Sequence, residues 1–333
     1  MATALTNQLF SRLRRVRHLT QQGFTLLELL VAVLIGGIIT SALLFLVIEM
    51  LRVNNREESL TQTQQNMRRA IDFMTRDLGE AVFVYSDFTG TSPDYNLLAE
   101  LDDEPTGTPV LAFWRLDPLS DDDVNDLNTF CPTQTGAVQE ECEALLVRQA
   151  TYTLVVYFHE TNAANDIWEG ASRIIRYQLP AYSVISTTAL TRNPGYADPT
   201  LPVPGIATTT FNSFDDWQKA ADGANTNGSS SVLTDYVNIV DTAATTACPT
   251  LPTAANASYV RTPTDDDSFY ACVTQPNNQT ANSQNVNKSV ILYLQGNASR
   301  RDPDRVIGVS EVSSLPKLES QVLIRGVIQN RPL

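Results

Sequence analysis

A long uncharged apolar segment near the N-terminus limits what this chain can fold into more than any other feature. The segment runs from Leu29 to Ile48 and is 20 residues long. As a helix it measures about 30 Å, which is the thickness of the hydrocarbon core of a bilayer. Residues 1–23 contain no acid and four arginines, Arg12, Arg14, Arg15 and Arg17. Because basic flanks stay in the cytoplasm, we expect one membrane-spanning helix with the remaining chain outside the cytoplasm.

The junction before this segment differs from that of an ordinary secretory signal. Such a signal carries small residues after its apolar core, where it is cut. Here the small residue, Gly23, precedes the apolar run, and a lone carboxylate, Glu28, lies at its start. A carboxylate at a membrane helix costs a few kcal/mol unless it is paired or neutralised. Two interpretations stay open: Glu28 reaches the lipid headgroups, or it meets a positive charge from another chain.

The residues of this junction have a known counterpart. Residues 23–30, GFTLLELL, resemble the cleavage and methylation motif of type IV prepilins and pseudopilins. The resemblance implies that a prepilin peptidase cuts between Gly23 and Phe24 and then methylates Phe24, the new N-terminal residue. It also implies that Glu28, the fifth mature residue, recognises the terminal amine of a neighbouring subunit during filament assembly.

The helix is predicted to continue beyond the membrane. The first proline is Pro93, and apolar residues recur three, four or seven positions apart from Leu60 to Val82. Within that stripe we expect Met67 and Met74 to pack in a core, and the helix to end near Gly79. The predicted segments are a cleaved leader at 1–23, the membrane-spanning half of the helix at 24–51, its amphipathic half at 52–85, and an exported β-rich domain at 86–333.

The exported domain is predicted to be rich in strands. These are Val110–Leu116, Leu145–His159, Arg173–Leu179, Val232–Val240, Val290–Gln295 and Val322–Ile328. A long helix followed by strands without βαβ alternation predicts an α+β fold with the helix packed on an antiparallel sheet. The resemblance implies the same type IV pilin-like architecture. Three polar stretches between strands are predicted to be surface loops: Thr187–Thr210, Ala220–Ser231 and Thr242–Asn287.

All four cysteines follow the apolar segment: Cys131, Cys142, Cys248 and Cys272. An even number on one side of a membrane span favours disulfides in an oxidising compartment. We expect nearest neighbours in the sequence to pair, because each pair then closes a short loop. Metal binding is the alternative, but the spacing lacks C-x-x-C and nearby histidines.

Charge and motif content exclude several functions. The net charge is −14, and without the four leader arginines 19 basic residues face 37 acidic ones, a net charge of −18. Such a surface repels phosphate backbones, so we expect no nucleic-acid partner. His159 is the only histidine after Gly23, and no hydrolase, phosphate-loop or dinucleotide motif accompanies it. We therefore expect no enzymatic activity and no cofactor.

Two acidic runs carry carboxylate oxygens of the kind that bind calcium. They are Asp117–Asp126 and Asp265–Asp267. Neither has the ligand spacing of an EF-hand loop, so we expect solvated loop charge and no metal site.

The resemblance implies a non-enzymatic filament subunit, a minor pseudopilin of a type IV pilus-like or type II secretion-like machine. Its implied partners are a prepilin peptidase, other pilins or pseudopilins and an inner-membrane assembly platform. Its implied location is the inner membrane, with a cytoplasmic N-terminus and a periplasmic or extracellular body. Segments 67–85 and 231–240 are similar to the large minor pseudopilins of the PilW and secretion-pseudopilin J type. The long Asn- and Thr-rich body is similar to pseudopilins of cyanobacterial hormogonium polysaccharide secretion, which implies polysaccharide export and gliding. The alternative is a minor pilin acting in adhesion or pilus priming.

Overall fold

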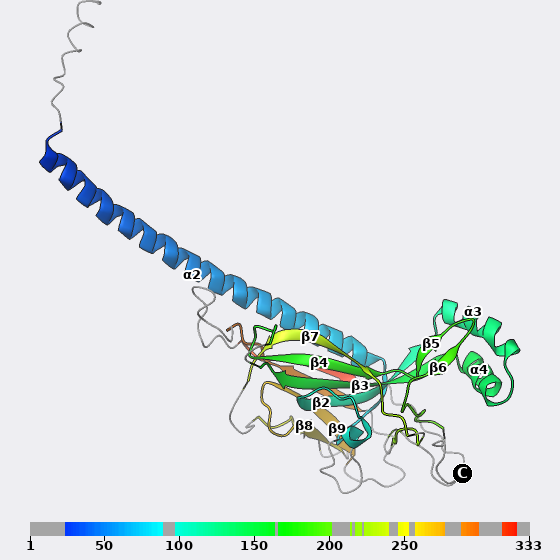
Figure 1. The fold of residues 1–333 in the computed structure, drawn as a ribbon. Coiled ribbons are helices and arrows are strands. Elements are labelled where there is room, and N and C mark those ends of the chain that lie inside the picture. Colours follow the sequence, from blue (N-terminus) through cyan, green and yellow to red (C-terminus); the bar gives the residue numbers. More distant parts are fainter. Residues whose placement is uncertain are drawn as a thin grey trace, which may run out of the picture. The chain divides into compact units, whose positions relative to one another are not determined.

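The computed structural model describes residues 24–88, 97–163, 166–201, 214, 217–221, 223–239, 246–252, 257–276, 288–299 and 315–324. Gly23 and the leader lie outside this part of the chain. The chain divides into two compact units, residues 1–54 and 55–333. Helix α2, Leu26–Gly79, contributes residues to both units, and each unit is described by itself (Figure 1).

Helix α2 is 54 residues long, as expected from the absence of proline and the abundance of good helix formers. It ends at Gly79, where the sequence analysis expected an end. The predicted helical segment 52–85 was nevertheless too long. Residues Ala81–Val84 form strand β1, because their β-branched and aromatic side chains favour a strand that pairs with β2.

The first sheet has five antiparallel strands in the order β1-β2-β3-β4-β7. The predicted strands at residues 110–116, 173–179 and 232–240 correspond to β2, β4 and β7. Both faces of this sheet are buried, which explains why its strands are almost continuously apolar. In β3, for example, Val155 and Tyr157 face one cluster, and Val156 and Phe158 face another. In the structure these strands have the bounds β2 Thr108–Pro118, β3 Ala150–Thr161, β4 Ser172–Leu179 and β7 Ser229–Val237.

A second antiparallel sheet, in the order β11-β10-β9-β8, was not predicted. Two of its strands lie in residues 242–287, which the sequence analysis wrongly assigned to a surface loop. Their short apolar runs, ASYVRT and FYACVT, are masked by the polar composition around them. The predicted strand at 322–328 begins earlier, and residues 325–328 lie outside the described residues. The bounds are β8 Ala257–Thr262, β9 Phe269–Pro276, β10 Ser289–Leu294 and β11 Leu318–Leu323.

Two helices and a β-ribbon form a small lobe in the second unit (Figure 1). Its elements are α3 Asp121–Phe130, the 3-10 helix η2 Cys131–Thr133, α4 Ala137–Arg148, β5 Tyr182–Ile185 and β6 Leu190–Arg192. They share a cluster that includes Leu127, Phe130 and Leu145. Two predictions are wrong in this lobe. The strand expected to begin at Leu145 begins at Ala150, and part of the acidic run 117–126, which was expected to be a loop, is helical. The predicted loop at 187–210 contains β6, and residues 202–210 lie outside the described residues.

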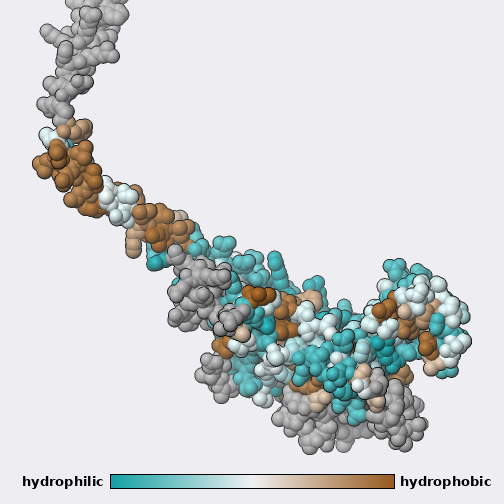
Figure 2. Space-filling view, in the orientation of Figure 1, coloured by the Kyte–Doolittle hydropathy of each residue, from teal (hydrophilic) through white to brown (hydrophobic). Residues whose placement is uncertain are grey.

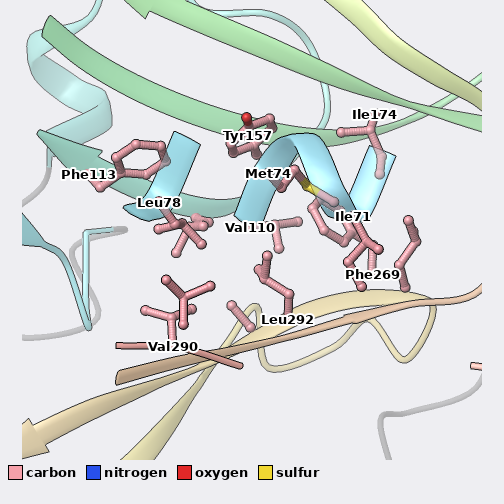
Figure 3. Packing of buried hydrophobic residues seen from close by; sticks show 14 of the residues in the cluster. Ile71, Met74, Leu78, Val110, Phe113, Tyr157, Ile174, Phe269, Val290 and Leu292 are labelled. Carbon is pink, nitrogen blue, oxygen red and sulfur yellow. The ribbon is translucent and has the colours of Figure 1, made fainter. Parts of the chain in front are cut away.

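Within the second unit, α2 lies between the two sheets (Figure 3). Its buried stripe includes Met67, Ile71, Met74 and Leu78. These side chains meet Phe113, Tyr157 and Ile174 of the first sheet and Phe269, Val290 and Leu292 of the second. The expected core role of Met67 and Met74 is confirmed. The helix therefore supplies the centre of the main core.

Candidate functional site: the start of helix α2 and its attachment to the sheets

Two of the residues singled out in the sequence lie at the start of α2, Glu28 in its first turn and Phe24 just before it. Phe24 precedes the helix and is 79% exposed. Thr25 Oγ1 accepts a hydrogen bond from the Glu28 amide at 3.3 Å, and the Thr25 carbonyl accepts one from the Leu29 amide at 3.1 Å. Thr25 thus acts as the N-cap, and the Thr-x-x-Glu spacing is that of a capping box. The motif therefore specifies where the helix begins.

Glu28 lies in the first turn, where the helix dipole favours a negative charge. Its side chain is exposed, and within the described part of the chain no side chain forms an ion pair with its carboxylate. The carboxylate is therefore available to a cation from outside the described residues.

The first half of α2 has an apolar surface. From Leu26 to Val53, the large apolar side chains are exposed, and Figure 2 shows this surface as brown. Among the described residues, α2 is the one helix long and apolar enough to cross a membrane; none of its apolar window is buried. Burial of these side chains therefore requires lipid or another chain. The length and hydropathy suggest a single-pass membrane anchor.

Gly36 and Gly37 do not interrupt the helix. A Cβ atom at either position would meet nothing within 4 Å inside the chain. The Thr40 hydroxyl donates to the Gly36 carbonyl at 2.7 Å and holds the turn together. Gly36 and Gly37 therefore expose the helix backbone at one place on a surface that otherwise carries large apolar side chains.

The second half of α2 is attached to the first sheet by a buried ionic cluster. Asp77 is 5% exposed and lies among Arg115 on β2, Tyr157 on β3 and Arg176 on β4. Arg115 Nη1 lies 2.5 Å from Oδ1, while Arg176 Nε and the Tyr157 hydroxyl lie 2.8 and 2.7 Å from Oδ2. One carboxylate therefore ties the helix to three adjacent strands.

The charges of this cluster stabilise one another. Burial alone would raise the pKa of Asp77, but the hydrogen bonds from Arg176 and Tyr157 and the charges of Arg176 and Arg115 lower it overall. Burial beside this carboxylate raises the pKa of the Tyr157 hydroxyl. The cluster is therefore an anion held by two cations and a neutral phenol.

Asp77, Arg115 and Arg176 are not among the functional residues predicted from the sequence. A signal was present, because Arg176 lies between Ile175 and Tyr177 in the strand SRIIRYQL and shares a face with Ile174. A buried arginine needs an anion, and Asp77 borders the apolar stripe of the helix. The sequence did not show that these two positions face each other.

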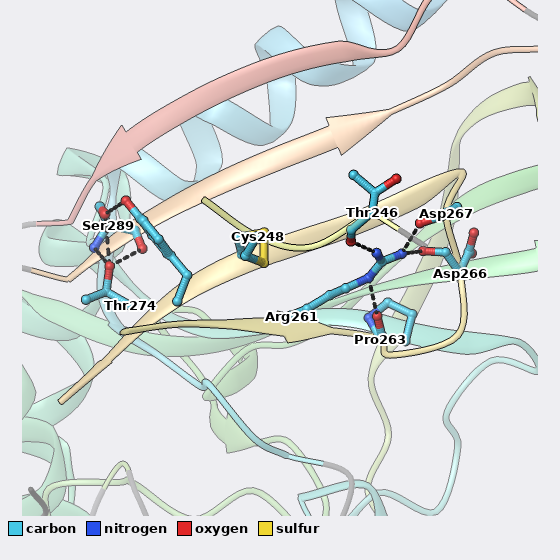
Figure 4. The surroundings of a disulfide bond; sticks show 10 residues. Thr246, Cys248, Arg261, Pro263, Asp266, Asp267, Thr274 and Ser289 are labelled. Carbon is cyan, nitrogen blue, oxygen red and sulfur yellow. Dashed lines mark hydrogen bonds and ion pairs between the residues drawn. A yellow bond between two sulfur atoms is a disulfide. The ribbon is translucent and has the colours of Figure 1, made fainter. Parts of the chain in front are cut away.

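The cysteines pair as nearest neighbours, Cys131 with Cys142 and Cys248 with Cys272. The first pair lies in the small lobe. The second ties the segment 246–252 to β9, and Arg261 adds hydrogen bonds to the carbonyls of Thr246 and Pro263 and an ion pair to Asp267 (Figure 4). The described cysteines are all in disulfides.

His159 takes part in a hydrogen-bonded chain. Its Nδ1 contacts Asp266 Oδ2, and its Nε2 lies 2.6 Å from Ser172 Oγ. The order is that of a catalytic triad, but Ser172 is 0% exposed and its hydroxyl also lies 2.9 Å from the Val237 carbonyl. A substrate cannot reach this hydroxyl. This series of hydrogen bonds from Ser172 through His159 to Asp266 links the first sheet to the turn before β9.

The acidic runs have partners of their own. Asp117 pairs with Arg115, and Asp123 forms a capping box with Ser120 at the start of α3. Asp266 contacts His159, and Asp267 pairs with Arg261. Among the described residues, no group of three or more acidic, histidine or cysteine side chains is arranged to hold a metal ion.

Comparison with known proteins supports the reading of the N-terminal segment. The prokaryotic N-terminal methylation motif matches residues 19–44, which include Gly23, Phe24 and Glu28. The match supports a type IV pilin or pseudopilin subunit, a class of structural filament subunits, and implies processing by a prepilin peptidase and assembly with other pilins. The long apolar helix followed by antiparallel sheets is a type IV pilin-like α+β fold. Comparisons with curated proteins and with solved structures found no match.

Proposed function

We propose that the chain is a minor pseudopilin, cut after Gly23, methylated at Phe24 and assembled through Glu28 into a short filament. The observation that carries the proposal is the match of the methylation motif to residues 19–44. The exposed Phe24 supports it further, as does the Glu28 carboxylate in the first turn of α2, which forms no ion pair with any of the residues that the structure describes. The subunit acts mechanically.

In the proposed mechanism, the two halves of α2 have different roles. Before assembly, the apolar first half holds the subunit in the inner membrane, with the N-terminus in the cytoplasm and the body on the other side. During assembly, Glu28 pairs with the methylated terminal amine of a neighbour, which offsets the cost of a carboxylate in lipid. The Asp77 cluster transmits the displacement of the helix to the sheets, because it joins α2 to three strands.

Removal of the Glu28 charge tests the assembly step. In cells that contain a prepilin peptidase and the partner pilins, Glu28→Gln is expected to be cut normally but to be absent from the sheared filament fraction. Glu49→Gln is the matched control, because Glu49 is also an exposed acid of α2 but pairs with Arg52 at 3.6 Å. Normal incorporation of the Glu28 variant would contradict the proposed pairing with the amine.

We further propose that the filament supports polysaccharide export and gliding, with an inner-membrane platform as a partner. The support is the long Asn- and Thr-rich body, which is similar to pseudopilins of that kind of system. A deletion strain distinguishes this role from adhesion or pilus priming. Loss of exported polysaccharide with normal surface attachment favours export, and the reverse result contradicts it.

A further inference from the structure

We propose that the exposed side of α2 in the second unit binds the acidic small lobe of a second copy of this chain. The contacting arginines are Arg68, Arg69 and Arg76. Both surfaces lie within residues 55–333, which form one compact unit. The inference rests on the proposed function, since it names a contact that joins subunits in the filament.

The side of α2 that faces away from the two sheets is positively charged. Five exposed residues fall on one arc of about 140° when 3.6 residues complete a turn. They are Arg68, Arg69, Asp72, Phe73 and Arg76. The Phe73 side chain is 38% exposed and adds an apolar group. The arc therefore offers a partner net positive charge together with an aromatic ring.

The arginines of this arc differ from those on the strands and the small lobe. Outside α2, each arginine that the structure describes in the second unit pairs with an acid. These are Arg115, Arg148, Arg173, Arg176, Arg192 and Arg261. Arg68, Arg69 and Arg76 form no ion pair with any described residue. In a chain with a net charge of −14, this arc is a place where cations are left for an external anion.

The small lobe carries the opposite charge. Residues 119–148 contain seven acids and one base, Arg148, which pairs with Asp198 outside these residues. Four of the acids have neither an ion pair nor a side-chain hydrogen bond to any described residue. They are Asp121, Asp122 and Asp126 on α3 and Glu140 on α4. The lobe is therefore the complement of the arginine arc in charge.

The acids of the lobe are held on a firm support. Ser120 and Asp123 form the capping box that begins α3. The Cys131–Cys142 disulfide joins η2 to α4, and the apolar sides of both helices share one cluster. The acidic surface is thus preorganised, which lowers the entropy lost on binding.

The two complementary surfaces belong to different elements. Within the described part of the chain, neither α3 nor α4 forms an ion pair or a side-chain hydrogen bond with α2. A contact between the lobe and the arc therefore joins two copies, and each copy keeps one free surface of each kind. Such a heterologous contact can repeat in one direction and produce an open filament. This self-complementarity is the reason for assigning the arc to a second copy.

Exposed ion pairs are individually weak and are screened by salt. The contact therefore needs several pairs at once, and Phe73 adds apolar burial that salt does not screen. We expect the contact to weaken as salt approaches about 1 M, where the Debye length is about 3 Å.

Photo-cross-linking from position 73 tests the contact. The full chain is produced in two differently tagged forms, in cells that contain a prepilin peptidase and the partner pilins. One form carries p-benzoylphenylalanine in place of Phe73, which keeps an aromatic side chain at this exposed position. After illumination, we expect mass spectrometry to find a cross-link to residues 119–148 of the other form. A cross-link only to a different pilin, or only to another part of the second copy, overturns the assignment.

Charge reversal shows whether the ion pairs hold the contact. Arg69→Glu with Arg76→Glu in the cross-linking copy is expected to remove most of the cross-link. Asp122→Arg with Asp126→Arg in the second copy should restore it, which misfolding of the first copy would not permit. Arg56→Glu is the matched control, because Arg56 is an exposed arginine of α2 that lies on a different side of the helix from Arg69. An equal loss in the control, or no restoration by the double reversal, overturns the proposal.

The same samples separate this inference from the proposed function. A parent chain that is cut and enters the sheared filament fraction without the cross-link overturns this inference alone. A chain that stays uncut and is absent from the filament fraction overturns the proposed function, and the contact between filament subunits with it.

Discussion

Asp77 holds a charge in the interior of the second unit, and its partners make that charge tolerable. Isolated burial of a carboxylate is strongly unfavourable. Arg115, Tyr157 and Arg176 supply two positive charges and a hydroxyl within hydrogen-bonding distance. The cost of burial is thereby offset, but only while all members are present. Loss of any one member is therefore expected to destabilise the fold by more than the loss of that member's own hydrogen bonds.

Replacement of the carboxylate exposes this dependence. Asp77→Asn is expected to lower the free energy of unfolding by about 3–5 kcal/mol, because the buried Arg176 loses its anion and the partly buried Arg115 keeps Asp117 but loses its buried partner. Asp72→Asn is the matched control on the exposed face of the same helix, with an expected change within about 0.5 kcal/mol. Denaturant unfolding of the full chain in detergent measures both. Equal effects of the two substitutions would show that the cluster contributes nothing specific.

The same cluster predicts how stability depends on pH. Because the pKa of Asp77 is lower in the folded chain than its ordinary 3.8, its contribution is fully present above that value. It is lost as the pH falls through the folded pKa, where the carboxyl becomes protonated. The difference in melting temperature between the parent chain and Asp77→Asn should therefore shrink on acidification. A difference that stays constant down to about pH 2 would contradict this account of the cluster.

The motif at the start of α2 is visible in the sequence, and the Asp77 cluster is not, for one physical reason. Gly23, Phe24 and Glu28 lie within six consecutive positions, so their relation is visible in the sequence. Asp77 and Arg176 are 99 positions apart. Their contact depends on how the helix packs on the sheet, which local patterns do not determine.

Among the elements, long regular segments were predicted well. The apolar period of α2 and the apolar strands of the first sheet are strong signals. The strands β8 and β9 were missed because their apolar runs are short and lie in an Asn- and Thr-rich stretch. Their burial comes from partners far away in the sequence, such as Val290 and Met74. Helix α3 was missed because its acids were interpreted as a solvated loop, although Ser120 and Asp123 form a capping box there.

The small lobe is expected to depend on its disulfide. Cys131 and Cys142 join η2 to α4 across 11 positions. Their joint replacement by serine should destabilise the lobe by about 2–3 kcal/mol, since the unfolded lobe gains chain entropy. Hydrogen exchange is the measurement, and we expect faster exchange in α3 and α4 with unchanged protection in β3 and β4. Loss of protection throughout both sheets would show that the lobe is not a separate cooperative unit.

At the scale of the whole molecule, the α+β class and the single apolar anchor followed from the sequence, but the two-sheet arrangement did not. The predicted single sheet would cover one side of the helix. The observed pair of sheets covers two sides, with Tyr157 of the first sheet and Leu292 of the second on opposite sides of Met74 (Figure 3). The amphipathic half of α2 is thus the centre of a core, while its first half remains available to lipid and to neighbouring subunits.

The central claim is that the chain is processed as a prepilin, and mass spectrometry of its N-terminus tests that claim most directly. The chain is produced with a prepilin peptidase, and Gly23→Leu serves as the uncut control. We predict a mature N-terminal peptide that begins at Phe24 and carries one methyl group on its amine, with residues 1–23 retained in the control. A parent chain that keeps residues 1–23, or that begins at any other residue, would contradict the account.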